Sequence, residues 1–216
     1  MKRTTIGVFG GTFDPIHFGH LRLALEVKQA LALDQLRLMP CHRPGHRDAP
    51  EVSDAQRVEM LKLALSTSDQ LQLDTREFER LGPSYSVDTL TEMRAELGPE
   101  ASLAWIVGSD AFAGLDRWHR WQELLDWGHL VVVMRPGWAL PESGPVAECL
   151  ARCQADGQVL GEKPAGHIVV QTLRLLPISA TDIRDQIRAG ESPQFLLPDS
   201  VWQFIQQQGL YARTSP

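Results

Sequence analysis

The sequence lacks the features of a secreted or membrane-spanning chain. It has 3 cysteines in 216 residues, an odd number that matches no zinc or redox spacing, so we expect free thiols in a reducing compartment. No apolar stretch reaches the roughly 18 residues that a membrane-spanning helix needs. The apolar patch after Lys2 and Arg3 is short and runs into a Gly-Gly-Thr-Phe-Asp turn, which predicts a strand rather than a signal peptide. These absences predict a cytoplasmic protein.

Long runs of one charge are missing as well. The formal net charge is −6, and without a basic run the sequence predicts no nucleic-acid partner and no membrane partner. Hydrophobic residues make up 43% of the chain and charged residues 22%, which is ordinary for a globular protein with a proper core. The sequence has no internal repeat. It does not indicate the oligomeric state.

The two common nucleotide-binding signatures, G-x-x-x-x-G-K-[S/T] and G-x-G-x-x-G, are also absent. In their place a short apolar run ends at Gly10 and Gly11, and a polar turn and a helical pattern follow. A strand, a glycine turn and a helix form the usual opening of a nucleotide site, because small residues admit a phosphate and the helix N-terminus supplies N–H donors. The turn carries His17 and His20, which are neighbours if the helix begins between them.

Three roles are open to this histidine pair from the residues alone. The rings could bind phosphate, they could cap the helix, or they could form half of a zinc site. Zinc takes three or four ligands, and no cysteine or further histidine lies nearby to complete such a site. The pattern therefore favours phosphate binding over capping, and capping over zinc.

Strand and helix patterns alternate through the rest of the chain. Five further segments read as strands, at Asp34–Met39, Gln70–Asp74, Leu103–Val107, Leu130–Met134 and His167–Leu173. Helical patterns lie between them, the first reaching about Leu33, and residues 138–166 look like a surface excursion with one short helix. This alternation predicts an α/β fold in which residues 1–216 form a single domain with a Rossmann-like, doubly wound parallel sheet.

Further polar groups are predicted at the same edge of that sheet. Gly108 and Asp110 follow a buried strand and should face the crevice beside the first glycine turn. The carboxylate of Asp110 would repel a phosphate, so we expect it to lie beside ribose hydroxyls or Mg²⁺. The loop at residues 41–50 holds two His-Arg pairs, and the residues leave open whether it is solvated or binds phosphate.

Three further segments have an ordinary structural interpretation. Ser179 followed by Asp182 resembles a capping box at the start of a helix. Trp118 and Trp121 lie three apart, which on a helix usually indicates core packing. Ser86 is a plausible N-cap for the helix that begins near Val87.

Four segments together resemble one family. Gly10–His20 reads Gly-Gly-Thr-Phe-Asp-Pro-Ile-His-Phe-Gly-His and resembles the (T/H)-x-G-H signature of nucleotidyltransferases, in the long form of bacterial nicotinate-nucleotide adenylyltransferases. Ser84-Tyr-Ser, Gly108-Ser-Asp and Ile178-Ser-Ala-Thr-Asp-Ile-Arg resemble the same family. The chain departs from the family pattern at Gly45, where a proline is usual, and at Ala180, where a serine is usual.

The resemblance implies a set of site residues. Those implied to bind ATP are Gly10, Gly11, Thr12, Phe13, His17, His20, Gly108, Asp110, Arg135, Ile178, Ser179 and Arg184. Those implied to bind nicotinate mononucleotide are Asp14, His46, Arg47, Tyr85, Ser86, Trp118 and His119. Of these, His17, His20 and Arg184 are implied to be catalytic, as cationic groups acting with the Mg²⁺ that accompanies ATP.

The implied reaction is adenylyl transfer from ATP to nicotinate mononucleotide, giving deamido-NAD and pyrophosphate in NAD biosynthesis. Two alternatives remain. Pantetheine-phosphate adenylyltransferases share the first motif and the serine-containing last one, but they are shorter and lack the Ser84–Ser86 and Trp118 features. A nucleotide-sensing module without catalysis is the other, and the intact set of His17, His20, Ser179 and Arg184 argues against it.

Overall fold

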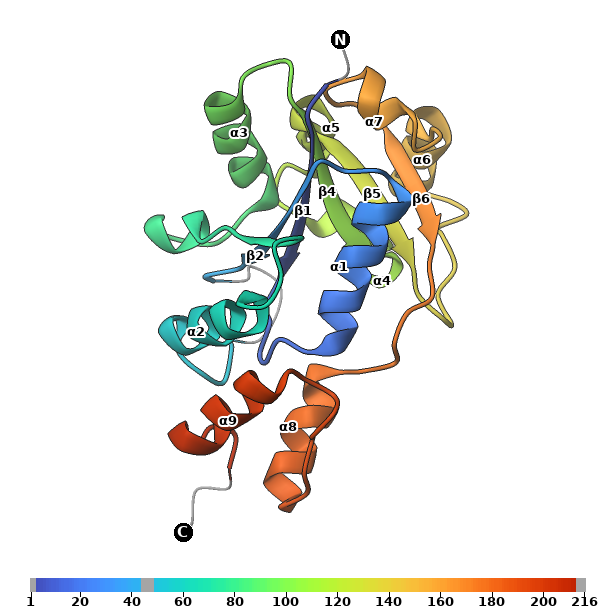
Figure 1. Cartoon of the computed structure of the whole chain (residues 1–216). Coiled ribbons are helices and arrows are strands. Elements are labelled where there is room, and N and C mark those ends of the chain that lie inside the picture. Colours follow the sequence, from blue (N-terminus) through green and yellow to red (C-terminus); the bar gives the residue numbers. More distant parts are fainter. Residues whose placement is uncertain (1–2, 44–48, 213–216) are drawn as a thin grey trace.

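One parallel β-sheet forms the centre of the molecule (Figure 1). The computed structural model describes residues 3–43 and 49–212. Within them the strand order is β3-β2-β1-β4-β5-β6, and every neighbouring pair is parallel. The strands are β1 (Thr5–Gly11), β2 (Gln35–Pro40), β3 (Gln72–Leu73), β4 (Ser102–Gly108), β5 (His129–Met134) and β6 (Ile168–Thr172). This order runs outward in both directions from β1, so the predicted doubly wound fold is confirmed.

Helices cover both faces of the sheet. They are α1 (Phe18–Ala30), α2 (Asp54–Leu65), α3 (Ser86–Leu97), α4 (Ser109–Phe112), α5 (Leu124–Trp127), α6 (Pro145–Cys153), α7 (Val159–Glu162), α8 (Ala180–Ala189) and α9 (Asp199–Gln208). Short 3-10 turns are η1 (Arg76–Glu79), η2 (Leu115–Arg117) and η3 (Trp121–Glu123). Among the described residues none of these helices is long and apolar enough to cross a membrane.

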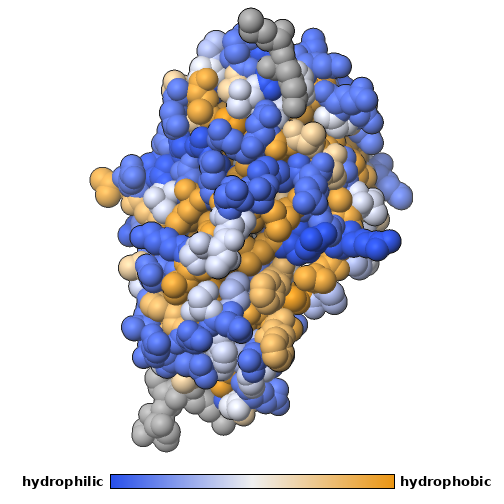
Figure 2. Space-filling model, in the orientation of Figure 1, coloured by the Kyte–Doolittle hydropathy of each residue, from blue (hydrophilic) through white to orange (hydrophobic). Residues whose placement is uncertain are grey.

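Two apolar clusters, one on each face, account for the layers. Successive residues of β5 enter opposite clusters, Val131 on the side of α1, α2 and α9, and Val132 on the side of α3, α5 and α6. A strand that is covered on both faces needs a continuous apolar run, because its side chains alternate between the faces. The face shown in Figure 2 is mainly hydrophilic, with apolar side chains interspersed and gathered across its middle.

Helices α8 and α9 lie beyond the end of the sheet toward which the strand arrows point (Figure 1). The N–H of Phe18 at the start of α1 donates to the carbonyl oxygen of Leu196, at 3.0 Å. The C-terminal part of the described chain therefore sits against the first turn of α1. This end of the sheet is where ligands bind in open α/β folds.

Several predicted boundaries were wrong. The third strand covers Gln72–Leu73 and not the predicted Gln70–Asp74. β3 is an edge strand, and the carboxylate of Asp74 directly after it forms ion pairs with Arg37 and Arg76. The first helix ends at Ala30 rather than near Leu33, and Ala32 follows with a φ of 48°.

Two further predictions need correction. Residues 138–166 are not only a surface excursion, since Val146, Cys149 and Leu150 of α6 are buried in the core. Trp118 and Trp121 do not share a helix, because η2 ends before the first and η3 begins at the second. Both rings pack partly buried against the core, as expected.

Candidate active site

The histidine pair lies where the first glycine turn becomes helix α1. His17 is the N-cap of α1, and its Nδ1 atom accepts a hydrogen bond from the backbone N–H of His20 at 3.4 Å. The two rings stack with centroids 3.6 Å apart and an interplanar angle of 22°. The expectation that the helix begins between the two residues is confirmed. Capping by His17 is observed too.

The charge state of His17 differs from the sequence-based expectation. Burial, with a smaller contribution from the positive charge of Arg135, lowers the pKa of His17 to about 4. The ring is therefore neutral at pH 7, and because Nδ1 accepts a hydrogen bond, the proton is on Nε2. His17 offers a neutral N–H donor rather than the expected cation.

The glycines of the turn are explained by aromatic packing. A Cβ atom at Gly10 would lie 2.9 Å from the Trp105 ring, and one at Gly11 would lie 2.9 Å from the ring of Phe13. Phe13 has a φ of 50° and its ring meets the His20 ring edge-on, with centroids 5.0 Å apart. The turn is thus packed by rings on its inner side, and the Phe13 ring also supports the ring of His20.

Helix α8 begins directly beside α1. A Cβ atom at Gly19 would lie 2.9 Å from the His17 ring and 3.2 Å from the carbonyl oxygen of Ile178. Ser179 is the N-cap of α8, and its Oγ accepts from the N–H of Asp182 at 3.3 Å. Of the predicted capping box, these described residues show the bond to the Ser179 side chain and not the reciprocal bond to the Asp182 carboxylate. Two helix N-termini, each a source of N–H donors and partial positive charge, meet at the end of β1.

Arg184 of α8 points back to the glycine turn. Its Nη1 donates to the carbonyl oxygen of Asp14 and its Nε to Oε1 of Glu51, both at 2.7 Å. The carboxylate of Asp14 is buried and accepts from the N–H of Glu51 at 2.8 Å and from the hydroxyl of Tyr211 at 2.5 Å. Arg184 and Asp14 are thus held in one hydrogen-bonded group with Glu51 and Tyr211.

The ends of β4 and β5 supply the other wall. Asp110 pairs with Arg135, with Nη1 and Oδ2 3.1 Å apart. The second oxygen of Asp110, Oδ1, is buried and has no hydrogen-bond partner among the described residues. Because β1, β4 and β5 are parallel neighbours, their carboxyl ends lie side by side at one edge of the sheet, as the sequence predicted.

The residues implied to bind the pyridine ring come together at the start of α3. The rings of Tyr85 and His119 stack with centroids 4.2 Å apart. Ser86 is the first residue of α3 and makes no side-chain cap, so its predicted capping role was wrong; Tyr85 holds the N-cap position in extended backbone. Trp118 directly precedes His119 and is half-buried. His46 and Arg47 lie outside the described residues.

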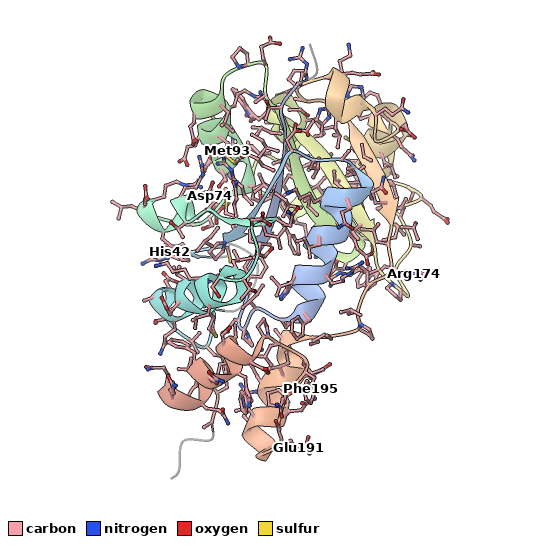
Figure 3. The ribbon with its side chains drawn as sticks, viewed as in Figure 1. His42, Asp74, Met93, Arg174, Glu191 and Phe195 are labelled. Atoms are coloured by element: carbon pink, nitrogen blue, oxygen red, sulfur yellow. The ribbon has the colours of Figure 1, made fainter. Side chains whose placement is uncertain are left out.

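One site residue was missed by sequence reasoning. Arg57 is completely buried, donates from Nη1 to the carbonyl oxygen of Thr12 at 2.8 Å, and forms an ion pair with Asp54. Asp54 in turn contacts Nδ1 of His42, which lies beside α2 in Figure 3. The backbone N–H of His42 donates to Oγ of Ser84 at 3.0 Å. A charged residue on the buried side of a helical pattern was the available signal.

This group of Arg57, Asp54, His42 and Ser84, which we name the strap, joins the two halves of the site. Its first end holds the glycine turn through Thr12. Its other end holds the segment directly before Tyr85. A buried arginine with a carboxylate partner is costly to disrupt, so the strap fixes the spacing of the two halves.

The donor set fits a magnesium ion that arrives with a nucleotide. No group of three or more His, Cys, Asp or Glu residues within the described part of the chain could hold a metal ion. Mg²⁺ on a nucleotide needs no such cage, since it keeps several waters and takes one or two carboxylates besides the phosphates. The unpartnered Oδ1 of Asp110 is a suitable carboxylate oxygen.

Comparison with known proteins finds relatives that share one name. The family model described as cytidylyltransferase-like matches residues 8–186. A protein of Cellvibrio japonicus named "Probable nicotinate-nucleotide adenylyltransferase" is 61% identical over 97% of this chain and 99% of its own length. A Marinobacter nauticus protein of the same name is 49% identical over 94% of this chain and 95% of its own.

Solved structures agree at the level of the fold. Plasmodium falciparum nicotinic acid mononucleotide adenylyltransferase complexed with NaAD has a TM-score of 0.71 at 16% identity, covering 95% of this chain and 96% of that one. The same protein complexed with APC has a TM-score of 0.69 at 16% identity, covering 98% of each chain.

Proposed function

The chain belongs to the cytidylyltransferase-like family and, within it, to the nicotinate-nucleotide adenylyltransferases, and we propose that it joins the adenylyl group of ATP to nicotinate mononucleotide. The products are deamido-NAD and pyrophosphate. The chain is a nucleotidyltransferase of NAD biosynthesis. We also propose that it acts in the cytoplasm, in keeping with its three free thiols.

The observation that carries this proposal is the meeting of α1 and α8 at the end of β1. Their N-termini approach so closely that a Cβ atom at Gly19 would lie 3.2 Å from the carbonyl oxygen of Ile178. Two helix N-termini and a stacked histidine pair form a suitable cradle for a triphosphate. The starts of these two helices lie in the segments Gly10–His20 and Ile178–Arg184, through which the sequence resembles the family.

The reaction needs no general base. The attacking atom is a phosphate oxygen of nicotinate mononucleotide, which is already ionised at neutral pH. It forms a bond to the α-phosphorus of ATP while the bond from that phosphorus to the α,β-bridging oxygen breaks, and pyrophosphate leaves with the electron pair. The chain has to align the two phosphates and stabilise the charge that develops.

We assign the stabilising groups to the ATP side of the crevice. His17 donates its Nε2–H as a neutral group, while His20 and Arg184 act on the phosphates from α1 and α8. Gly10, Gly11, Thr12 and Phe13 shape the turn, Ile178 and Ser179 begin the second helix, and Gly108, Asp110 and Arg135 form the opposite wall. Mg²⁺ bound with ATP would neutralise phosphate charge, and Asp110 is the residue that would face it.

We assign the mononucleotide to the start of α3. Backbone N–H groups at a helix start are donors only, so they suit the carboxylate of nicotinate. Trp118, Tyr85 and His119 supply aromatic surface for the pyridine ring. The implied roles of Ser86, Asp14, His46 and Arg47 at this substrate stay proposals; the carboxylate of Asp14 already receives two internal hydrogen bonds.

A direct test measures pyrophosphate release from ATP with one acceptor at a time. Nicotinate mononucleotide should support turnover, while nicotinamide mononucleotide should support much less. Phosphopantetheine, the acceptor of the alternative family, should support none. Turnover with phosphopantetheine alone would overturn the proposal, and so would binding of ATP without turnover of any acceptor.

A further inference from the structure

Glu51 places a carboxylate between two arginines of α8. Its Oε1 accepts from Nε of Arg184 at 2.7 Å, and its Oε2 contacts Nη2 of Arg188. Glu51 comes from the chain before α2, far from α8 in sequence. Hydrogen bonds and positive charge from the two arginines lower the pKa of Glu51, so it is ionised at neutral pH.

The position of Glu51 is fixed from its backbone as well. Its N–H donates to Oδ2 of Asp14 at 2.8 Å, while the carbonyl oxygen of Asp14 accepts from Nη1 of Arg184 at 2.7 Å. Glu51, Asp14 and Arg184 therefore form a closed ring of contacts. Such a ring restricts Glu51 and Arg184 together, so that less side-chain entropy is lost for each contact that is formed.

Three of the five N–H donors of the Arg184 guanidinium already have internal acceptors. Nε serves Glu51 and Nη1 serves Asp14, while Nη2 lies 3.5 Å from Oγ1 of Thr181. Both arginines also have carboxylate partners, since Arg184 pairs with Glu51, and Arg188 pairs with Glu51 and Asp185. An incoming polyphosphate meets an arginine that is already neutralised by an internal carboxylate.

We propose that Glu51 is an internal anion that competes with the triphosphate of ATP for Arg184. This inference rests on the proposed role of Arg184 as a phosphate ligand. The carboxylate occupies Nε, which is one of the donors that a phosphate oxygen would take. Glu51 thereby weakens the binding of ATP and, after the reaction, of pyrophosphate, which favours release of that product.

The test compares two variants that each remove one negative charge beside α8. Glu51→Gln keeps the size of the side chain and the backbone N–H that holds Asp14. Asp185→Asn is the matched control, since the Asp185 side chain pairs with Arg188 and is not among the hydrogen-bond partners of the Arg184 guanidinium. Calorimetry then gives the dissociation constants of ATP and of pyrophosphate for the wild type and both variants.

Glu51→Gln should bind both ligands on the order of fivefold more tightly, the value of one half-exposed ion pair. Asp185→Asn should change either constant by less than about twofold. Equal tightening in both variants would indicate a general effect of net charge and would overturn the inference. Unchanged or weaker binding in Glu51→Gln would overturn it too, since Glu51 would then only hold Arg184 in place.

The same preparations separate this inference from the proposed function. Turnover of nicotinate mononucleotide by the wild type, with no tightening in Glu51→Gln, contradicts the role of Glu51 alone. Tightening in Glu51→Gln without turnover of that acceptor contradicts the assigned reaction and keeps the competition at Arg184.

Discussion

The hydroxyl of Tyr211 donates a 2.5 Å hydrogen bond to Oδ1 of Asp14, across 197 positions of the chain. Tyr211 is 7% exposed and Asp14 5%, so neither group can exchange this contact freely for water. The bond ties the segment after α9 to the turn that carries the first nucleotide motif. Asp14 also fixes Arg184 through its carbonyl oxygen, so the tyrosine acts on both motifs at once.

Tyr211→Phe should lower the free energy of unfolding by about 1–3 kcal/mol, because a buried carboxylate oxygen loses its donor. Urea unfolding measures the change. In a double-mutant cycle with Asp14→Asn, the double variant should cost less than the sum of the single ones. Additive costs would show that the two groups do not interact in solution.

Stability should also depend on pH through two buried histidines. The pKa values of His17 and His129 are each lowered to about 4 from 6.5. A histidine with a lowered folded pKa takes up its proton more readily when unfolded, so its contribution is complete above about pH 6.5 and is lost as the pH falls toward 4. Each histidine should account for about 3 kcal/mol over that window.

The variant His17→Asn isolates one of these contributions. As the pH falls from 7 to 4, urea unfolding should show the wild type losing about 3 kcal/mol more stability than the variant, because asparagine does not titrate. A constant difference between the two proteins would mean that His17 titrates normally in the folded state.

Capping and catalysis by His17 can be separated with the same variant. Asparagine is a good N-cap, so His17→Asn should keep the helix start but lose the Nε2–H donor. We expect the activation free energy to rise by about 3 kcal/mol, seen as a lower kcat, with a smaller change in KM. His17→Ala should lose the same kcat and some stability besides, and His20→Ala should also lower kcat more than it raises KM. Near-normal kcat in His17→Asn would leave His17 with capping alone.

The strap predicts a strong coupling between Arg57 and Asp54. Arg57→Met should destabilise the protein by about 3–5 kcal/mol, because Asp54 and the carbonyl oxygen of Thr12 lose a buried partner. Adding Asp54→Asn should recover part of that loss. Met60→Ala is a control on the same helix, since Met60 is equally buried and has no N–H group to donate to Thr12.

Activity distinguishes the strap from ordinary packing. Arg57→Met should raise KM for ATP beyond any loss of folded protein, whereas Met60→Ala should lower stability and leave KM unchanged. Equal KM values in the two variants would contradict a positioning role for Arg57.

Substrate choice should follow from the donors at the start of α3. N–H groups that satisfy a carboxylate meet the NH₂ of nicotinamide with a mismatch, and such polar mismatches give roughly 10⁴-fold selectivity. The ratio of kcat/KM for the two mononucleotides measures it. Trp118→Ala should damage the use of both substrates and keep most of the ratio, because both carry the pyridinium ring. A ratio that collapsed in this variant would assign selectivity to the ring.

Local patterns in the sequence were sufficient for the sheet and the motif positions. The continuous apolar runs of β4 and β5 predict strands covered on both faces, and carboxyl ends of parallel strands meet at one edge. That is why Gly11, Asp110 and Arg135 could be assigned to one crevice in advance. The edge strand β3 was less predictable, since the fate of Asp74 depends on Arg37 and Arg76.

Only the tertiary structure decided how the charges of the site are arranged. No pattern reveals that the glycine turn contacts Arg57, that Asp14 accepts from Tyr211, or that Glu51 faces Arg184. The protonation of His17 likewise depends on burial and on Arg135, which is distant in sequence. Electrostatic and hydrogen-bond partners act through space, so their effect depends on the distance between the two groups. That distance is known only once the sheet and its helices have brought remote segments together.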